Sequence, residues 1–180
     1  MENRIDMKKV ELSEALNQLR NASGGDSLLV AQVMTQDPIC ISDNTTALDL
    51  AKMFHSKRFR HLLVCDGGGR LVGLVSDRDL IGCFSPLDPP TQEQLAQIAT
   101  SVLMSTDLLT VQPDSTIIHA VNLMLKHGIN SLPVIEEGRL RGIVTTTDLK
   151  ILLQVFLERA ELERAKSDES ARAAEAVTAN

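Results

Sequence analysis

Apolar and polar positions follow the same order twice along this chain, which indicates two similar structural units. The short apolar runs 39–41 and 109–111 have the length and composition of strands. In residues 47–54 and 117–124, apolar side chains recur every three or four positions, as expected for one buried face of a helix. Two further apolar runs and a second helical pattern follow in each unit. The order strand, helix, strand, strand, helix is therefore predicted for both halves.

Turns and helix starts carry the residue types that these elements require. Glycines at 67–69 and at Gly138 separate the paired apolar runs, which predicts a hairpin in each half. Gly128 is expected to end the first helix of the second half, since glycine readily takes the left-handed conformation found there. The predicted helix starts are Asp43-Asn44-Thr45 and Pro113-Asp114-Ser115 for the first helix of each half, and Asp77 and Thr146 or Thr147 for the last.

The two halves are copies of one unit. Val33-Met34-Thr35 aligns with Leu103-Met104-Ser105 at an offset of 70 residues. One residue is lost at the Gly-rich turn, and beyond it residues 73–80 align with 142–149 at an offset of 69. A hairpin turn tolerates such a deletion. This internal repeat predicts two like units packed against each other.

Segments outside the repeats complete the organisation. Residues 7–20 have a helical pattern that Ser23-Gly24-Gly25 ends, and another helix is predicted from Thr91, after the proline-rich break at 85–90. From residue 166 the chain is rich in alanine and charge, which predicts a frayed or disordered tail. The predicted organisation is an N-terminal helical segment at 1–26, a first repeat at 27–84, a linker with a helix at 85–100, a second repeat at 101–157, and a helical to disordered tail at 158–180.

Composition predicts an aliphatic core and argues against several partners. The 180 residues are 43% hydrophobic but contain no Trp or Tyr and only four Phe, so aromatic platforms for nucleic-acid bases are lacking. A net charge of −6 also argues against a nucleic-acid partner. Neither a signal peptide nor an apolar run of membrane-spanning length is found, so a cytoplasmic protein with no membrane partner is expected. Three widely spaced cysteines, Cys40, Cys65 and Cys83, are expected to be reduced and buried.

Candidate chemistry lies where the third strand of each unit meets the last helix. Residues 73–79 and 142–148 both read Gly, two apolar residues, Ser or Thr, two further residues and Asp. The glycine lets a ligand or a strand approach the backbone closely. A hydroxyl at the strand end can bind a sugar or phosphate oxygen, and a carboxylate in the first helical turn can accept both hydroxyls of a ribose. Backbone N–H groups at the helix start favour an anion nearby.

The same pattern also caps helices. A Ser or Thr followed three residues later by an acid forms a capping box, in which side chains satisfy free N–H groups at the helix start. A single copy favours capping over ligand binding, and a duplicated unit duplicates its caps. The residues of the pattern alone therefore leave both interpretations open.

Both units resemble cystathionine-β-synthase-type (CBS) domains, and together they resemble a complete CBS pair, or Bateman module. The resemblance implies an α/β (α+β) fold in which two βαββα units pack around a pseudo-twofold axis, with flanking helices. It also implies two clefts for adenosine nucleotides and assembly of two chains into a disc-like homodimer. The matching residues are 33–39, 60–64 and 73–80 in the first unit, and 103–105, 130–135 and 142–149 in the second.

The resemblance also implies which residues bind the nucleotide. Asp79 and Asp148 would bind ribose. Basic residues lie beside the first cleft and uncharged ones take their place beside the second, so the clefts are expected to differ in affinity. The remaining implied residues are Ile39 and Leu109, whose backbone would enclose adenine; Ser76 and Thr145 at sugar or phosphate; Arg60, His61 and Arg78 near the phosphate of the first cleft; and Asn130, Ser131 and Thr147 at the corresponding positions of the second.

Three hypotheses for the function follow. The first is a regulatory module without catalytic activity, which senses AMP, ADP, ATP or another adenosyl ligand and passes its occupancy to a separate effector protein. The second is a structural module that dimerises or docks on a partner and binds no nucleotide. An enzyme ranks last, because no Ser, His and acid constellation and no metal-ligand spacing stands out. No catalytic residue, metal or required cofactor is therefore predicted.

Overall fold

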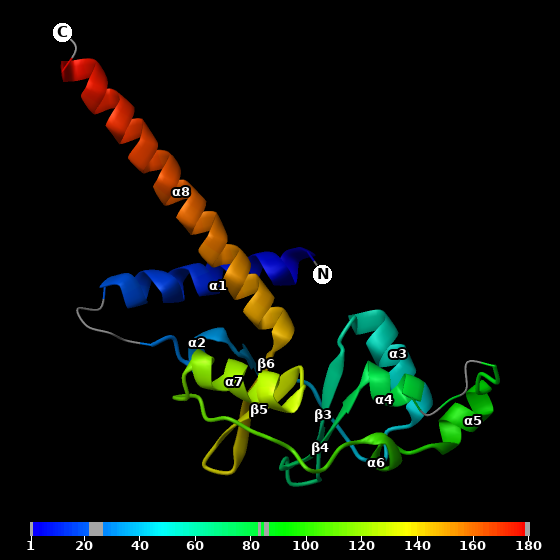
Figure 1. The fold of residues 1–180 in the computed structure, drawn as a ribbon. Helices are drawn as coiled ribbons and strands as arrows, with labels where there is room; N and C mark the ends of the chain where they lie inside the picture. The colour runs from blue at the N-terminus through cyan, green and yellow to red at the C-terminus, as the bar shows by residue number, and fades with distance from the viewer. Residues whose placement is uncertain (1, 22–26, 83, 85–86, 179–180) are drawn as a thin grey trace.

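Two three-stranded sheets lie side by side, and a pair of crossing helices packs over one of them (Figure 1). The computed structural model describes residues 2–21, 27–82, 84 and 87–178. The first sheet has the strand order β2-β3-β4 and the second β1-β6-β5. The elements are α1 (Glu2–Asn21), α2 (Val30–Val33), β1 (Thr35–Gln36), β2 (Cys40–Ile41), α3 (Ala47–Lys57), β3 (His61–Cys65), β4 (Leu71–Ser76), α4 (Asp77–Gly82), α5 (Gln92–Gln97), α6 (Thr100–Leu103), α7 (Ile117–His127), β5 (Ser131–Glu136), β6 (Arg139–Thr145) and α8 (Thr146–Thr178).

The two repeats exchange their opening segments. Strand β1 belongs to the first repeat by sequence, yet it pairs antiparallel with β6 of the second, with Thr35 opposite Ile143. An antiparallel bridge between Leu74 and Ser105 mirrors this pairing at the first sheet. Each sheet is therefore completed by a residue or strand from the other half of the chain.

Glycine at the start of the Gly-apolar-apolar-Ser/Thr-x-x-Asp segment makes this crossing possible. A Cβ atom added at Gly142 would lie 2.8 Å from the backbone oxygen of Thr35 and 2.7 Å from the sulfur of Met34. At Gly73 an added Cβ would overlap the side chain of Met104. Of the two roles considered for this glycine, close approach of a strand is the one that the structure supports.

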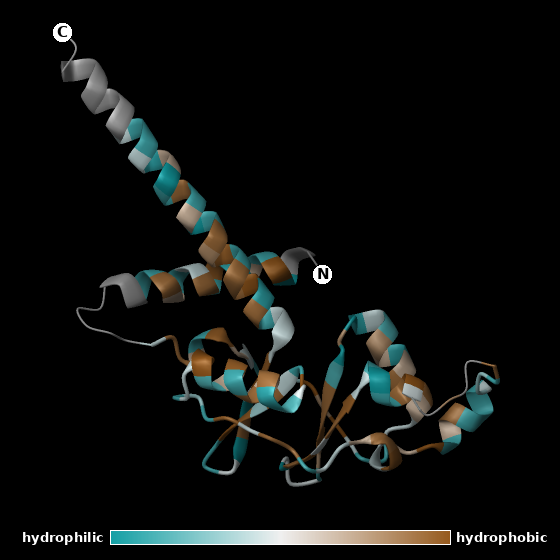
Figure 2. Cartoon of the chain, viewed as in Figure 1, coloured by the Kyte–Doolittle hydropathy of each residue, from teal (hydrophilic) through white to brown (hydrophobic). Residues whose placement is uncertain are grey.

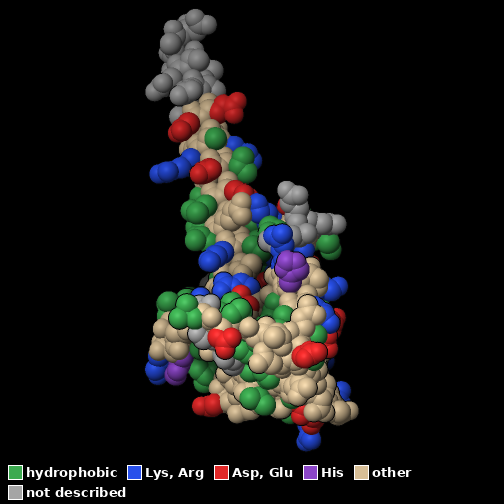
Figure 3. Space-filling model, turned by 90° about the vertical axis from the view of Figure 1, so that its right-hand side faces the viewer, with side chains coloured by type: hydrophobic (Ala, Val, Ile, Leu, Met, Phe, Trp, Pro, Cys, Tyr) green, Lys and Arg blue, Asp and Glu red, His purple; other side chains and the backbone are tan. Residues whose placement is uncertain are grey.

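Two aliphatic cores of unequal size hold the fold together. The first sheet and α3 bury Leu50, Leu62, Val64 and Val75 between them. The second core is larger, because α1, α2 and α8 add residues to those of β5, β6 and α7. Helices α1 and α8 meet at hydrophobic residues, and beyond this crossing α8 extends away from the sheets with mostly charged side chains (Figures 2 and 3). The buried residues of the second core are Leu12, Val30, Val33, Val111, Ile117, Ala120, Met124, Leu132, Val134, Val144, Ile151 and Val155.

The first helix of each repeat begins later than predicted. The caps are Thr46 and Thr116, whose hydroxyls accept the N–H group three residues on, at 3.2 and 3.1 Å. The segments 43–45 and 113–115 instead accept hydrogen bonds from the short helices that open the opposite repeats. These bonds run from the Thr100 N–H to the Thr45 carbonyl at 2.8 Å and from the Ala31 N–H to the Pro113 carbonyl at 2.9 Å.

Three further expectations need correction. Of the predicted strand 109–111, only Val111 pairs, in an isolated bridge with Val134. Helix α1 begins at Glu2, while its predicted stop at 23–25 lies outside the described residues. The predicted frayed tail is instead helical through Thr178, as the last part of α8. Gly128, by contrast, ends α7 with a φ of 64°, as predicted.

The cysteines also differ from expectation. Cys40 on β2 and Cys65 on β3 are joined by a disulfide, with their Cα atoms 5.8 Å apart. The two strands run parallel as neighbours, and this separation lies within the usual range for a disulfide. Cys83 lies outside the described residues. The expectation of reduced thiols is therefore wrong for this pair.

Candidate functional site

Each strand-to-helix junction forms a capping box built around one carboxylate oxygen. At the first junction, Asp79 Oδ2 accepts the N–H and the hydroxyl of Ser76, both at 2.7 Å. At the second, Asp148 Oδ2 accepts the N–H of Thr145 at 2.8 Å and its hydroxyl at 2.6 Å. The hydroxyl in turn receives the Asp N–H at 3.3 Å in both copies. The capping interpretation is thus correct for both, and it fixes each carboxylate at the end of a strand.

The first junction gathers the basic residues predicted for it. His61 begins β3 directly opposite Ser76 on β4. Arg60 Nε lies 3.3 Å from the carboxylate of Asp77, in the first turn of α4, and Arg78 is exposed on the next position. Burial lowers the pKa of His61 below its ordinary 6.5, against the opposing effect of the Asp77 carboxylate. Because His61 is therefore mainly neutral at pH 7, the guanidinium groups carry most of the positive charge here.

The second junction repeats this geometry with uncharged residues at the positions of Arg60, His61 and Arg78. Ser131 begins β5 opposite Thr145 and is buried. The Asn130 carbonyl accepts the Thr146 N–H at 3.0 Å, as the Arg60 carbonyl accepts the Asp77 N–H in the first repeat. Thr147 is exposed in the first turn of α8.

Two residues that the sequence analysis did not place at this site contact Asp148. Thr35 donates its hydroxyl to Asp148 Oδ1 at 3.3 Å, from the strand that crosses over Gly142. Lys8 of α1 places its ammonium nitrogen 3.9 Å from the same oxygen and donates to the Met34 carbonyl at 2.6 Å. A hydroxyl residue recurs at the position of Thr35 in the second repeat, as Ser105, and this recurrence was a sequence signal for the hydrogen bond of Thr35. Nothing in the sequence pattern around Lys8 signalled its contact with Asp148, because that contact depends on how α1 packs.

The residues predicted to enclose adenine lie at the other edge of each sheet. Ile39 comes directly before β2 and is 42% exposed, and Leu109 is 36% exposed. Strand β3 lies between β2 and β4, so the backbone of Ile39 and the Ser76 hydroxyl flank the same central strand. The backbone of Ile39 and the Ser76 hydroxyl therefore belong to one sheet but are separated by β3.

Comparison with known proteins identifies this architecture. Residues 30–85 and 98–154, more than half of the chain, match the model of the CBS domain. The chain belongs to the CBS domain family. A CBS domain-containing protein of Dictyostelium discoideum is 35% identical over 138 residues, covering 73% of this chain and 94% of that protein.

Solved structures of CBS proteins have the same fold. A Vibrio cholerae protein assigned to acetoin utilization (AcuB) is 28% identical, with a TM-score of 0.64 over 76% of this chain and 97% of that one. The CBS domain pair of protein MJ0100, solved in complex with 5'-methylthioadenosine and S-adenosyl-L-methionine, is 26% identical, with a TM-score of 0.61 over 72% and 98% of the two chains. The predicted α+β fold of two CBS repeats is confirmed.

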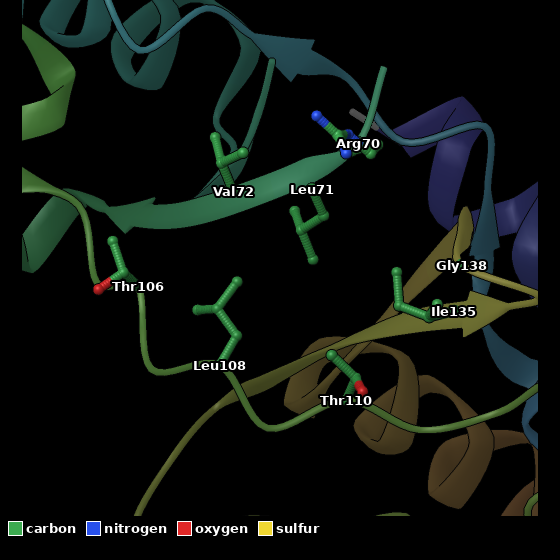
Figure 4. Close-up of a pocket in the computed structure, with 8 residues that line it drawn as sticks. All are labelled: Arg70, Leu71, Val72, Thr106, Leu108, Thr110, Ile135 and Gly138. Carbon is green, nitrogen blue, oxygen red and sulfur yellow. The ribbon is translucent and has the colours of Figure 1, made fainter. Parts of the chain in front are cut away.

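A cleft of about 320 Å³ lies elsewhere in the CBS pair, between the start of β4 and the segment that precedes Val111. Leu71 and Leu108 point into it from opposite sides (Figure 4). No residue predicted to bind nucleotide lines this cleft. The lining residues are Arg70, Leu71, Val72, Thr106, Leu108, Thr110, Ile135 and Gly138.

The described part of the CBS pair holds no cluster of three His, Cys, Asp or Glu side chains able to bind a metal ion. Of the helices that the structure describes, none combines the length and the apolar character needed to cross a membrane.

Proposed function

We propose that this CBS pair is a regulatory module without catalytic activity that binds adenosine nucleotides of the AMP, ADP or ATP type. The observation that carries the proposal is the first junction, where Ser76 fixes the Asp79 carboxylate and the charges of Asp79, Arg60 and Arg78 all act on His61. The relative MJ0100, whose CBS pair was solved with two adenosyl ligands, supports the ligand class.

Each part of an adenosine nucleotide has a chemical partner on the first repeat. The Asp79 carboxylate accepts hydrogen bonds, as a ribose diol requires, and its position is fixed by the capping box. A phosphate is attracted by the guanidinium groups of Arg60 and Arg78. Ile39 offers backbone groups and an exposed aliphatic side chain to adenine. The second junction offers the same partners for ribose through Asp148, but Asn130, Ser131 and Thr147 supply no cation for a phosphate.

Isothermal titration with AMP, ADP, ATP and S-adenosylmethionine tests the proposal. Replacing Asp79 by Asn should weaken binding at the first site at least tenfold, because an amide donates where the ribose hydroxyls also donate. Asp114→Asn, which changes an exposed carboxylate at the start of the α7 segment, is the matched control and should leave binding unchanged. Absence of heat with every ligand, for protein shown to be folded, would contradict the proposal.

Nucleotide binding would change the geometry of a homodimer, and a separate effector protein would recognise that change. Helix α7 offers a surface for a second copy of the chain, since Ile118 and Leu125 are 67% and 76% exposed on it. These residues lie seven positions apart and so share one face of the helix. The effect on the effector is then limited by the difference between the affinities of the nucleotide for the two dimer geometries.

A further inference from the structure

Helix α1 covers the second junction. Its Lys8 side chain is only 12% exposed, and the Asp148 side chain beneath it only 5%. The ammonium group donates to the Met34 carbonyl at 2.6 Å and lies 3.9 Å from Asp148 Oδ1. Asp79, at the same position in the first repeat, is only half-buried. The two junctions thus differ in access as well as in charge.

The position of Lys8 is the one that a ribose would need. Asp148 Oδ2 is already engaged by the N–H and hydroxyl of Thr145. Its other oxygen faces the Thr35 hydroxyl and the Lys8 ammonium. A diol that binds Asp148 has to reach this second oxygen, so it competes with Lys8 for the same place.

Contacts of the residues that follow Lys8 hold α1 against the rest of the molecule. Leu12 and Ala15 are buried, Leu12 completely. Arg159 of α8 donates to the Ser13 backbone carbonyl and, at 2.6 Å, to the Ser13 hydroxyl. Lys9 adds an ion pair with Glu158 of α8 at 3.2 Å.

Burial disfavours the charged form of Lys8 more than the nearby carboxylates favour it. Burial lowers the pKa of Lys8, and this effect outweighs the attraction of Asp148 and Glu11. A distance of 3.9 Å is at the limit of an ion pair and too long for a charge-assisted hydrogen bond. Moving Lys8 into water therefore restores its hydration and costs the hydrogen bond to the Met34 carbonyl and the long ion pairs with Asp148 and Glu11. Such a contact can be displaced by a ligand.

We propose that α1 is an intramolecular cover of the second nucleotide site, with Lys8 in the place of the ribose, so that nucleotide binds there only when α1 moves aside. The inference rests on the proposed function, since it concerns access to one of its two sites. It assigns regulation to a segment that precedes both repeats.

Titration of AMP into the full chain with Asp79→Asn isolates the second site. Adding Lys8→Met, which keeps the length of the side chain and removes its charge, should strengthen AMP binding at least tenfold. Arg159→Met, which removes the hydrogen bonds from α8 to Ser13 of α1 and leaves Lys8 in place, should strengthen it as well. Lys126→Met, an exposed lysine on α7, is the matched control and should have no effect.

Hydrogen exchange gives a second readout. Saturating AMP should speed amide exchange in residues 5–16 of α1 at least fivefold in the Asp79→Asn chain. Weaker AMP binding after Lys8→Met would overturn the inference, because Lys8 would then be a ligand contact. Unchanged binding after both Lys8→Met and Arg159→Met, with the first site of the wild-type chain still binding AMP, would overturn it and leave the proposed function standing. No heat at either site in any variant would overturn both.

Discussion

Ser76 and Thr145 illustrate how one residue can serve both structure and binding. Each hydroxyl accepts the Asp N–H of a capping box and donates to the same carboxylate. A carboxylate that already receives two hydrogen bonds on one oxygen has a fixed orientation. A ligand that binds its other oxygen therefore loses little free energy to ordering this side chain. Capping and ribose binding are therefore compatible interpretations of one motif.

His61 should make stability depend on pH. Its folded-state pKa is lowered by burial, so the unfolded chain binds more protons below about pH 6.5. The contribution to the free energy of unfolding is complete above that pH and is lost as pH falls. Urea denaturation at pH 7.5 and 5.0 should show a smaller difference in His61→Gln than in wild type. His127→Gln, at an exposed position on α7, should keep the wild-type difference. A full difference in His61→Gln would contradict the assignment.

Among single residues, local motifs were predictable and long-range contacts were not. The pairing of Ser76 with Asp79 follows from a spacing of three residues at a helix start. Thr35 was visible as a repeated position, but its hydrogen bond to Asp148 spans 113 residues. Cys40 and Cys65 meet because β2 and β3 are parallel neighbours, and no pattern along the chain contains that register.

At the scale of elements, hydrophobic periodicity located the helices and hairpins, while the crossing of the opening segments remained hidden. Strand β1 has only two residues, too few to produce alternation. Its partner β6 lies about a hundred residues away, in the other repeat. The helix starts were misplaced for the same reason, since residues 43–45 and 113–115 bind helices from the opposite repeat.

Gly142→Ala tests the crossing. The added methyl group would meet the Thr35 backbone oxygen at 2.8 Å, so β1 and β6 must separate. Overpacking of this kind costs about 1–3 kcal/mol in the free energy of unfolding, measurable by urea denaturation. Gly67→Ala is the matched control, because no atom lies within 4 Å of its added Cβ, and it should change stability by less than about 0.5 kcal/mol. Equal effects of the two substitutions would argue against a tight crossing.

At the scale of the whole molecule, the sequence indicated a CBS pair with unequal halves, and the structure places a larger core and an additional helix on the second half. Helix α1 was predicted as a flank, but its packing over Asp148 depends on contacts with α8 that no single-segment pattern encodes. The assembly of two chains also belongs to this scale.

Leu125→Glu should convert the proposed homodimer into a monomer. A carboxylate at a position that is 76% exposed leaves the isolated chain folded, but burying it between two copies would cost several kcal/mol. Size-exclusion chromatography with light scattering would report the mass. Leu162→Glu, at a comparably exposed position on the extended part of α8, should leave the mass of the dimer unchanged. A dimer that survives Leu125→Glu would place the interface elsewhere.

The crossed opening segments also affect how the chain folds during its synthesis. Strand β1 is made early, but it pairs only after β6, about a hundred residues later, has been made. At roughly 5–20 residues per second, this delay is on the order of 5–20 seconds. Val30 and Val33 are completely buried in the folded chain, but during this delay the residues of β6 that complete their core have not been made. The nascent chain thus exposes Val30 and Val33 until the second repeat has been translated as far as β6.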